Sequence, residues 1–217
     1  SDITSDIETG DHTQPVFIVS NSYKSFVLNG GGVAAQTKDS TAVAIEYRDN
    51  LVQLADFTGN LLVGDNPNSA VLSGYLIILC QGVFDPINSI NNTESSLSDV
   101  NQYSNQVYST NILAGIYNAQ NLISNWDNSS CYLTAEGGVY RLNPNTLNVN
   151  LLVSVNASVI STITESYADS DTTVAYSEML YMNDLDNPNT IYKYSFSLLS
   201  FTDTIIVDGA VKDIAFY

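Results

Sequence analysis

The sequence predicts an all-β protein, organised as a small propeller-like domain of four to five blades. Short segments rich in Val, Ile, Thr and Tyr alternate with turn residues along the chain, as they do in β-sandwiches, barrels and propellers. A strand–turn–strand pattern also recurs after about 50 residues, close to the spacing of successive propeller blades. The alternative fold is a β-sandwich or jelly roll in which an N-terminal strand is exchanged between subunits.

The N-terminal half begins with a polar, acidic arm over residues 1–14, and we expect a single all-β domain over residues 15–217. Alternating apolar and polar residues predict strands in this half. Thr41–Tyr47 and Leu51–Phe57 are joined by a short turn and predict a hairpin. The strands expected in this half are Pro15–Val19, Ser25–Leu28, Thr41–Tyr47, Leu51–Phe57, Leu61–Val63 and Val71–Phe84.

Residues 88–111 form the least hydrophobic part of the chain and predict a long surface loop. Val107–Ile123 is the one stretch that could be considered for a helix. Thr110, Gly115 and several Asn residues oppose helix formation there, because their helix propensities are low. The sequence therefore predicts little or no helix.

The C-terminal half is regular, and two of its features repeat. The strands Gly138–Leu142 and Thr190–Tyr194 share an apolar–Tyr–basic pattern, and each is followed by a turn and an apolar strand. Asn-Pro-Asn occurs at residues 66–68, 143–145 and 187–189, and this tripeptide suits tight turns. The strands expected in this half are Ile112–Ile116, Cys131–Ala135, Gly138–Leu142, Asn148–Val155, Ser158–Thr164, Thr173–Ser177, Met179–Met182, Thr190–Phe196, Thr204–Val207 and Val211–Tyr217.

These motifs resemble the blade repeats of β-propellers of the YVTN or quinoprotein type. The resemblance lies in Gly138–Leu142, in Ile191–Tyr194 and in Asp208–Phe216, the last of which looks like the end of one blade and the innermost strand of the next. It covers residues 111–217, and no clear copy precedes Gly82. The resemblance implies a propeller fold and carries no catalytic residue over to this chain.

Basic residues are scarce: the chain has six Lys and Arg against 23 Asp and Glu, and its formal net charge is −17. Nucleic acids and anionic lipid surfaces require a basic footprint, so the charge argues against both classes of partner. Charged residues make up only 13% of the chain, and hydroxyl and amide side chains take their place. No apolar window is long enough to insert into a membrane. This composition predicts an extracellular or cell-surface protein that self-associates, as a homo-oligomer or a filament.

Two cysteines, Cys80 and Cys131, are an even number and predict one disulfide if the protein is secreted. The alternative is two unpaired thiols in the core, for which Cys80 at the end of an apolar run is the better candidate. Three sequons predict N-glycosylation, at Asn91, Asn128 and Asn156.

No cofactor is expected, apart from a candidate Ca²⁺ site. Asp184, Asp186 and Asn189 offer hard oxygen ligands that Ca²⁺ can use, and the alternative is an ordinary polar loop. His12 is the only histidine, so neither a His-based zinc site nor a Ser-His-Asp triad is expected. Two further acidic groups could likewise bind Ca²⁺ or be ordinary polar segments. They are Asp169 with Asp171, and Asp2, Asp6, Glu8 and Asp11 in the arm.

Trp126, flanked by Asn125 and Asp127, is the best candidate for an exposed aromatic contact with a ligand, and the alternative is a core anchor. Glycoside hydrolysis needs two carboxylates on opposite sides of a cleft. Carboxylates that lie in or beside expected strands are Glu46, Asp56, Glu136 and Glu178. Glu46 and Glu178 are expected to face solvent from alternating strands.

Three functions remain open. The low charge and the lack of a catalytic constellation favour a non-enzymatic extracellular protein with a structural or adhesive role, such as a self-assembling filament or surface-layer subunit. The second is a secreted propeller module that binds carbohydrate or protein, which aromatic-lined blade pockets would favour. The third is a secreted glycan-active hydrolase, which a deep pocket with two convergent carboxylates would favour.

Overall fold

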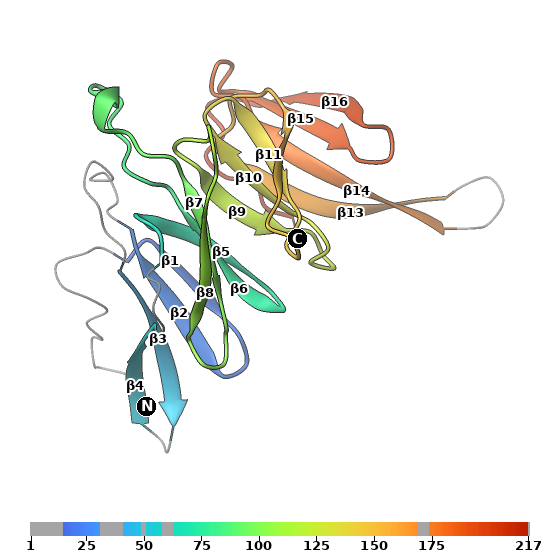
Figure 1. Cartoon of the computed structure of the whole chain (residues 1–217). Coiled ribbons are helices and arrows are strands. Elements are labelled where there is room, and N and C mark those ends of the chain that lie inside the picture. Colours follow the sequence, from blue (N-terminus) through green and yellow to red (C-terminus); the bar gives the residue numbers. More distant parts are fainter. Residues whose placement is uncertain (1–14, 31–40, 49–50, 58–62, 169–173, 217) are drawn as a thin grey trace. The chain divides into compact units, whose positions relative to one another are not determined.

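The computed structural model (Figure 1) describes these parts of the 217-residue chain: residues 15–30, 41–48, 51–57, 63–168 and 174–216. The described residues form sixteen β-strands and one short 3₁₀ turn, Ser89–Asn91. No helix among them has the length and apolar character that crossing a membrane requires. The all-β class predicted from the sequence is confirmed.

The sixteen strands form four antiparallel sheets, and within each sheet the strands follow one another in chain order. A four-stranded antiparallel meander is the form of a propeller blade, so the described strands make four blades. The propeller-like prediction is confirmed, and two packed sheets of a β-sandwich are not what these strands form. The blades are β1 (Phe17–Ser20), β2 (Lys24–Asn29), β3 (Thr41–Arg48) and β4 (Leu51–Asp56); β5 (Pro67–Ser73), β6 (Tyr75–Cys80), β7 (Ser96–Val100) and β8 (Val107–Ile112); β9 (Gln120–Ser124), β10 (Cys131–Ala135), β11 (Gly138–Leu142) and β12 (Val149–Val153); and β13 (Ile160–Ala168), β14 (Val174–Asn183), β15 (Thr190–Ser195) and β16 (Ser200–Ile206).

The chain divides into two compact units, Ser1–Asn118 and Ala119–Tyr217, and each unit contains two blades. Within each unit the first strands of the two blades contact each other: β1 contacts β5 in the first unit, and β9 contacts β13 in the second. Propeller blades are arranged in this way, with their first strands nearest the central axis. The predicted arm over residues 1–14 lies outside the described residues.

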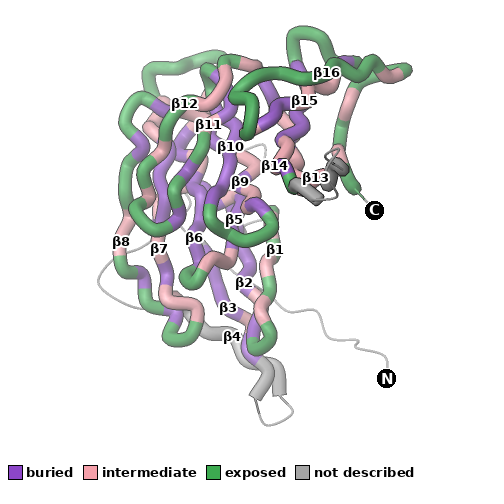
Figure 2. The backbone as a smooth tube through the Cα atoms, turned by 90° about the vertical axis from the view of Figure 1, so that its right-hand side faces the viewer, coloured by how far each residue is buried: buried purple, intermediate pink, exposed green. Residues whose placement is uncertain are grey.

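The core of the first unit is built from apolar side chains of both of its blades. Phe26 and Leu28 on β2 are fully buried in this core, and Val27 between them is buried as well. The run Leu76–Cys80 on β6 is buried at every position, and Figure 2 shows most of β6 in the colour of buried residues. Burial on both faces explains why this segment is apolar throughout rather than alternating.

The core of the second unit combines aliphatic and aromatic side chains. Leu180 and Met182 on β14 are fully buried and pack with Tyr132 of β10. The Tyr132 ring lies 5.0 Å from that of Phe196, and Phe196 forms an edge contact with Tyr194 at 5.5 Å. Such aromatic pairs add specific geometry to the burial that stabilises the blades.

Gly74 divides Val71–Phe84, a segment that the sequence predicts as one strand. Val71–Phe84 contains the end of β5 and all of β6, and these two strands form a hairpin. Gly74 has a φ of 73°, which side chains with a Cβ rarely adopt, and it reverses the chain between Ser73 and Tyr75. The alternation of apolar residues did not reveal this turn.

The expected surface loop at residues 88–111 contains strand β7 and most of β8, and Val107–Ile123 holds strands rather than a helix. These strands are polar because hydroxyl groups hydrogen-bond across the pair: Ser98 Oγ lies 3.0 Å from Thr110 Oγ1. Residues 211–216, expected as a strand, carry no strand in the structure.

The expected disulfide between Cys80 and Cys131 is absent, and both residues are free thiols. Cys80 lies on β6 in the core of the first unit, where its Sγ is 3.9 Å from Ser98 Oγ. Cys131 is fully buried on β10 in the second unit. The core-thiol interpretation is therefore correct for both residues. Burial raises the pKa of each thiol to about 12.

We expect neither thiol to react with a thiol-specific reagent in the folded protein at neutral pH. The thiolate is the reactive species, and burial suppresses both its formation and its access to reagent. Both thiols should react once the protein is unfolded in guanidinium. Counting modified cysteines by intact mass before and after unfolding checks this result. Rapid labelling of either residue in the folded state would contradict the described cores.

Candidate functional site

The turn between β9 and β10, Asn125–Ser130, is held by its own polar side chains. The Asn125 N–H donates to the Ser130 carbonyl oxygen at 3.0 Å, and the Ser130 N–H donates to Asn125 Oδ1 at 3.1 Å. The Ser129 N–H donates to Asp127 Oδ1 at 2.9 Å. Hydrogen bonds from Ser129 lower the pKa of Asp127, so this carboxylate stays charged and keeps the turn closed.

Trp126 projects from this turn, which we call the Trp126 turn. Its side chain is 76% exposed, and it is the only tryptophan of the chain. The neighbouring Asn128 has a left-handed φ of 57°, a conformation that Asn tolerates well. An exposed ring on a constrained turn loses little conformational freedom when a ligand covers it. Of the two sequence interpretations, the structure supports the exposed aromatic and not the core anchor.

A small pocket lies beside Trp126, and we call it the glutamate pocket. Its volume is about 190 Å³. Glu178 of β14 contributes a half-buried carboxylate, and Thr164 of β13 contributes a buried Oγ1 that has no hydrogen-bond partner among the described residues. The pocket is smaller than sites for drug-sized ligands, which span about 300–1,000 Å³, and it suits a single ring or a terminal group. Its lining residues are Ser124, Trp126, Thr162, Ile163, Thr164 and Glu178.

Two hydrogen-bond donors hold the Glu178 carboxylate in place. The Tyr132 hydroxyl donates to Oε1 at 3.1 Å, and Asn125 Nδ2 donates to Oε2 at 3.2 Å. Burial, aided by the charge of Glu178, raises the pKa of Tyr132, so its phenol remains a donor over the physiological range. Each carboxylate oxygen has two lone pairs, so Glu178 can still accept a hydrogen bond from a ligand hydroxyl.

A second pocket borders the same turn, and we call it the arginine pocket. Arg141 of β11 donates from Nε and from Nη2 to Ser130 Oγ, at 3.2 and 2.7 Å. The volume of the arginine pocket is about 420 Å³. The Trp126 turn therefore contributes residues to two pockets, one with a carboxylate and one with a guanidinium. The lining residues of the arginine pocket are Ser129, Ser130, Arg141, Asn143, Asn148, Asn150, Leu151 and Leu152.

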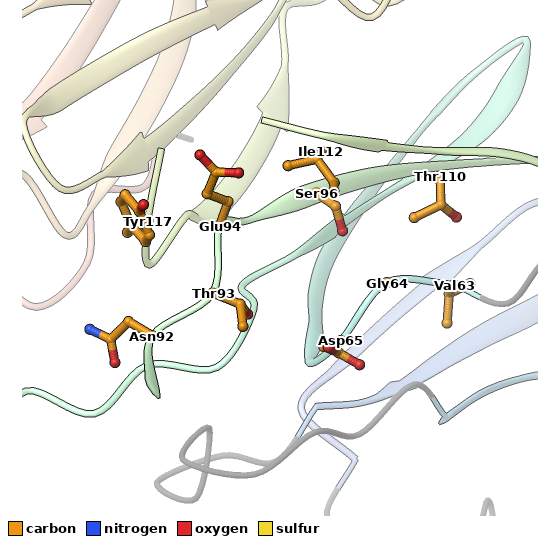
Figure 3. Close-up of a pocket in the computed structure, with 10 residues that line it drawn as sticks. All are labelled: Val63, Gly64, Asp65, Asn92, Thr93, Glu94, Ser96, Thr110, Ile112 and Tyr117. Carbon is orange, nitrogen blue, oxygen red and sulfur yellow. The ribbon is translucent and has the colours of Figure 1, made fainter. Parts of the chain in front are cut away.

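A larger pocket of about 680 Å³ lies in the first unit and contains two carboxylates, Asp65 and Glu94 (Figure 3). Two carboxylates in one pocket are what the hydrolase hypothesis asks for. Figure 3 shows the two groups on different sides of Ser96 and Thr93, with the Glu94 carboxylate pointing away from Asp65. Glu94 Oε1 also accepts the Gly115 N–H at 2.7 Å. The pocket is therefore polar, but its carboxylates do not converge.

The carboxylates named from the sequence have different surroundings in the structure. Glu46 is buried and forms an ion pair with Lys24, with Oε1 and Nζ 2.6 Å apart, so its expected solvent-facing position is wrong. Glu178 lines the glutamate pocket and is half-buried rather than solvent-facing. Glu136 is exposed in the turn between β10 and β11. The side chain of Asp56 lies outside the described residues.

Asp184, the first residue of the candidate Ca²⁺ site, stabilises the turn between β14 and β15. Its Oδ1 accepts the Asp186 N–H at 2.9 Å, and its Oδ2 accepts Asn187 Nδ2 at 2.8 Å. Burial opposes ionisation, but these hydrogen bonds outweigh it and lower the pKa of Asp184. The described residues contain no group of three or more His, Cys, Asp or Glu side chains that could hold a metal ion, and Asn189 is exposed. The acidic groups at residues 2–11 and at 169–171, and His12, lie outside the described residues.

The three sequon asparagines, Asn91, Asn128 and Asn156, are exposed. Asn128 belongs to the Trp126 turn, so a glycan on it would lie next to the tryptophan. Asn156 Nδ2 makes one long hydrogen bond, 3.4 Å, to Asp186. Glycosylation at each site is sterically open and remains a prediction.

No protein-family model and no curated protein sequence matches this chain. Solved structures with a similar fold include the dihydro-heme d1 dehydrogenase NirN in complex with DHE, with a TM-score of 0.55 and 11% identity over 87% of this chain and 36% of that chain. Hydrazine synthase from Kuenenia stuttgartiensis has a TM-score of 0.55 and 10% identity, over 95% of this chain and 53% of that chain. A proposed 6-phosphogluconolactonase from Bacteroides fragilis has a TM-score of 0.55 and 11% identity, over 94% of this chain and 59% of that chain.

These neighbours are β-propeller-type proteins, which agrees with the four described blades. The chain spans between 36% and 59% of their lengths. At such low identity the likeness shows the fold alone, because one propeller fold hosts many unrelated functions.

Proposed function

We propose that this chain is a non-catalytic, propeller-type binding module that acts outside the cell and recognises glycans at the Trp126 turn. The observation that carries the proposal is an exposed tryptophan on a constrained turn beside a pocket with polar groups available. Aromatic rings held in this way supply large contact areas to a ligand at low entropic cost.

The chemistry of the glutamate pocket matches that of a sugar ring. A pyranose presents an apolar C–H face, which can pack on the Trp126 indole, and a rim of hydroxyl groups. Glu178 can accept from one hydroxyl, and Thr164 Oγ1 can both donate and accept. A buried hydroxyl without a partner carries a desolvation cost that a bound ligand hydroxyl would relieve.

Composition supports the extracellular and adhesive part of the proposal. The surface relies on hydroxyl and amide groups, the net charge is −17, and three exposed sequons are available. A strongly negative chain is repelled by nucleic acids and by anionic lipid surfaces, which leaves neutral or selectively bound ligands as partners.

The decisive test replaces Trp126 by Ala. We expect the affinity for a glycan identified on a glycan array to fall by about 30-fold or more, the effect of losing a central aromatic anchor. Tyr176→Ala is the matched control, because Tyr176 is also an exposed aromatic of the second unit, at 70%, and lines neither pocket at the turn. Isothermal titration calorimetry measures both variants. Equal losses, or glycan binding that survives in Trp126→Ala, would reject the site.

Self-association is the second candidate function, and strand β16 is the observation that favours it. Every residue of β16 is exposed, and it is the last strand of its sheet (Figure 2). Its Phe201 and Ile206 are 46% and 65% exposed. An apolar edge strand is a template for pairing with another chain. Sedimentation at rising protein concentration distinguishes the two candidate functions. A monomer that binds glycans supports the binding module, and polymers without glycan binding support the filament.

A further inference from the structure

Arg141 is unusual because no carboxylate of the described residues pairs with it. The chain has six basic residues against 23 acidic ones, so carboxylates are abundant. The two ion pairs that the described residues form are Lys24 with Glu46 and Lys193 with Glu165. Arg141 hydrogen-bonds only to the Ser130 hydroxyl within the same described part of the chain. An unpaired guanidinium in so acidic a protein is a localised positive charge.

The Ser130 hydroxyl fixes the guanidinium without neutralising it. Nε and one Nη2 hydrogen are directed to Ser130 Oγ. A guanidinium carries five N–H donors, so three remain. Ser130 is itself buried and belongs to the constrained Trp126 turn. The free donors are therefore held in a planar fork, which matches the two oxygens of a carboxylate.

The other lining groups of the arginine pocket are neutral. Asn143 uses its Oδ1 to accept the Asn145 and Thr146 N–H groups, at 2.9 and 3.2 Å, which leaves its Nδ2 donors for other partners. Asn148 and Asn150 add further amides, and none of the lining residues is acidic. The pocket thus offers one positive charge and several donors, which is the complement of a carboxylate rather than of a cation.

We propose that the arginine pocket binds the carboxylate of an acidic sugar, so that the ligand of the Trp126 turn is a uronate- or sialate-bearing glycan. This inference rests on the proposed function, because the neighbouring ring of the same ligand is the one that packs on Trp126. Both pockets take residues from the Trp126 turn or its flank, and in this proposal adjacent rings of one oligosaccharide occupy them together. The net charge of −17 opposes densely sulfated polyanions, and one guanidinium suits a ligand with few charges.

Matched ligand pairs test the inference. In two pairs the members differ only by a hydroxymethyl or a carboxylate group at C6: a glucose- and a glucuronate-terminated disaccharide, and a galactose- and a galacturonate-terminated one. The third pair is a galactose-terminated lactosamine and its sialylated form. We expect the intact protein to bind the acidic member of at least one pair about tenfold or more tightly, as charge-assisted hydrogen bonds would give. The preference should shrink as salt is raised, since exposed charges are screened.

Two variants test whether Arg141 causes the preference for the acidic ligand. Arg141→Gln should remove the preference for the acidic member, because the affinity for the acidic member falls far more than the affinity for the neutral member. Lys212→Gln removes the same charge from another exposed position of the second unit and should keep the preference. A preference that persists in Arg141→Gln overturns the inference. Equal binding of both members by the intact protein, lost in Trp126→Ala, overturns the inference but leaves the proposed function standing. No binding of either member in any pair overturns both.

Discussion

Replacing Lys24 by Met is expected to lower the free energy of unfolding by about 3–5 kcal/mol, because it removes the ammonium that pairs with the buried Glu46 carboxylate. Lys24 Nζ lies 2.6 Å from Glu46 Oε1, and the two side chains are 6% and 8% exposed. Nζ also donates to Asn105 Oδ1 and to the Tyr103 carbonyl oxygen, both at 2.9 Å. Without the ammonium, the Glu46 carboxylate loses its 2.6 Å charged partner and keeps the 3.2 Å hydrogen bond from Asn105.

Lys193→Met is the matched control for this prediction. Its ion pair with Glu165 is nearly as short, 2.7 Å, but the side chains are 20% and 33% exposed. Pairs that water can reach contribute up to about 1 kcal/mol, so this variant should lose far less stability. Urea unfolding of both variants gives the comparison. Similar losses would mean that the Lys24–Glu46 pair is not buried. The double variant Lys24→Met, Glu46→Leu should recover much of the loss, since an apolar pair avoids the desolvation cost.

Gly138→Ala should destabilise the second unit by roughly 3 kcal/mol, since it combines backbone strain with a steric clash. Gly138 begins β11 with a φ of 149°, which side chains with a Cβ rarely adopt. A Cβ there would meet the Val153 carbonyl oxygen and the Leu151 side chain, both from β12. Gly138 is also the first residue of a repeated motif seen in the sequence, and the close approach of β12 explains the glycine.

Gly209→Ala separates the two causes. Gly209 has a φ of 120°, but a Cβ at this position would have no atom within 4 Å, so its replacement adds strain without a clash. We expect a loss of about 1 kcal/mol for Gly209→Ala. Thermal or urea unfolding checks both variants. If Gly138→Ala were no worse than Gly209→Ala, the close packing of β11 and β12 would be wrong.

Strand positions were largely predictable because the blades alternate apolar and polar residues over short distances. The apolar run from Leu76 to Cys80 and the shorter one from Phe26 to Leu28 are local signals, and both became core strands. β7 was missed because Ser98 satisfies its polarity through a partner on β8, which is a pairing that a local pattern does not contain. The turn at Gly74 was missed because glycine was the sole signal in an otherwise apolar segment.

The site was predictable only in part. Polar neighbours marked Trp126 as a candidate contact, and the structure shows why: Asn125 and Asp127 close the turn that exposes it. Thr164 and Arg141 were not recognised, because their roles depend on which strands lie beside the turn. The same limit applies to Glu46, whose burial depends on pairing with Lys24 on the neighbouring strand.

The most direct test of the glycan-binding account uses Trp126 as its own probe. The chain has no other tryptophan, so intrinsic indole fluorescence reports from this one position. The free protein should emit at long wavelength and be strongly quenched by acrylamide, because the ring is 76% exposed. Titration with a glycan that binds in calorimetry should shift the emission to shorter wavelength and protect it from quenching, with the same dissociation constant. Saturable glycan binding that leaves emission and quenching unchanged would contradict the account, because the ligand would then occupy another surface.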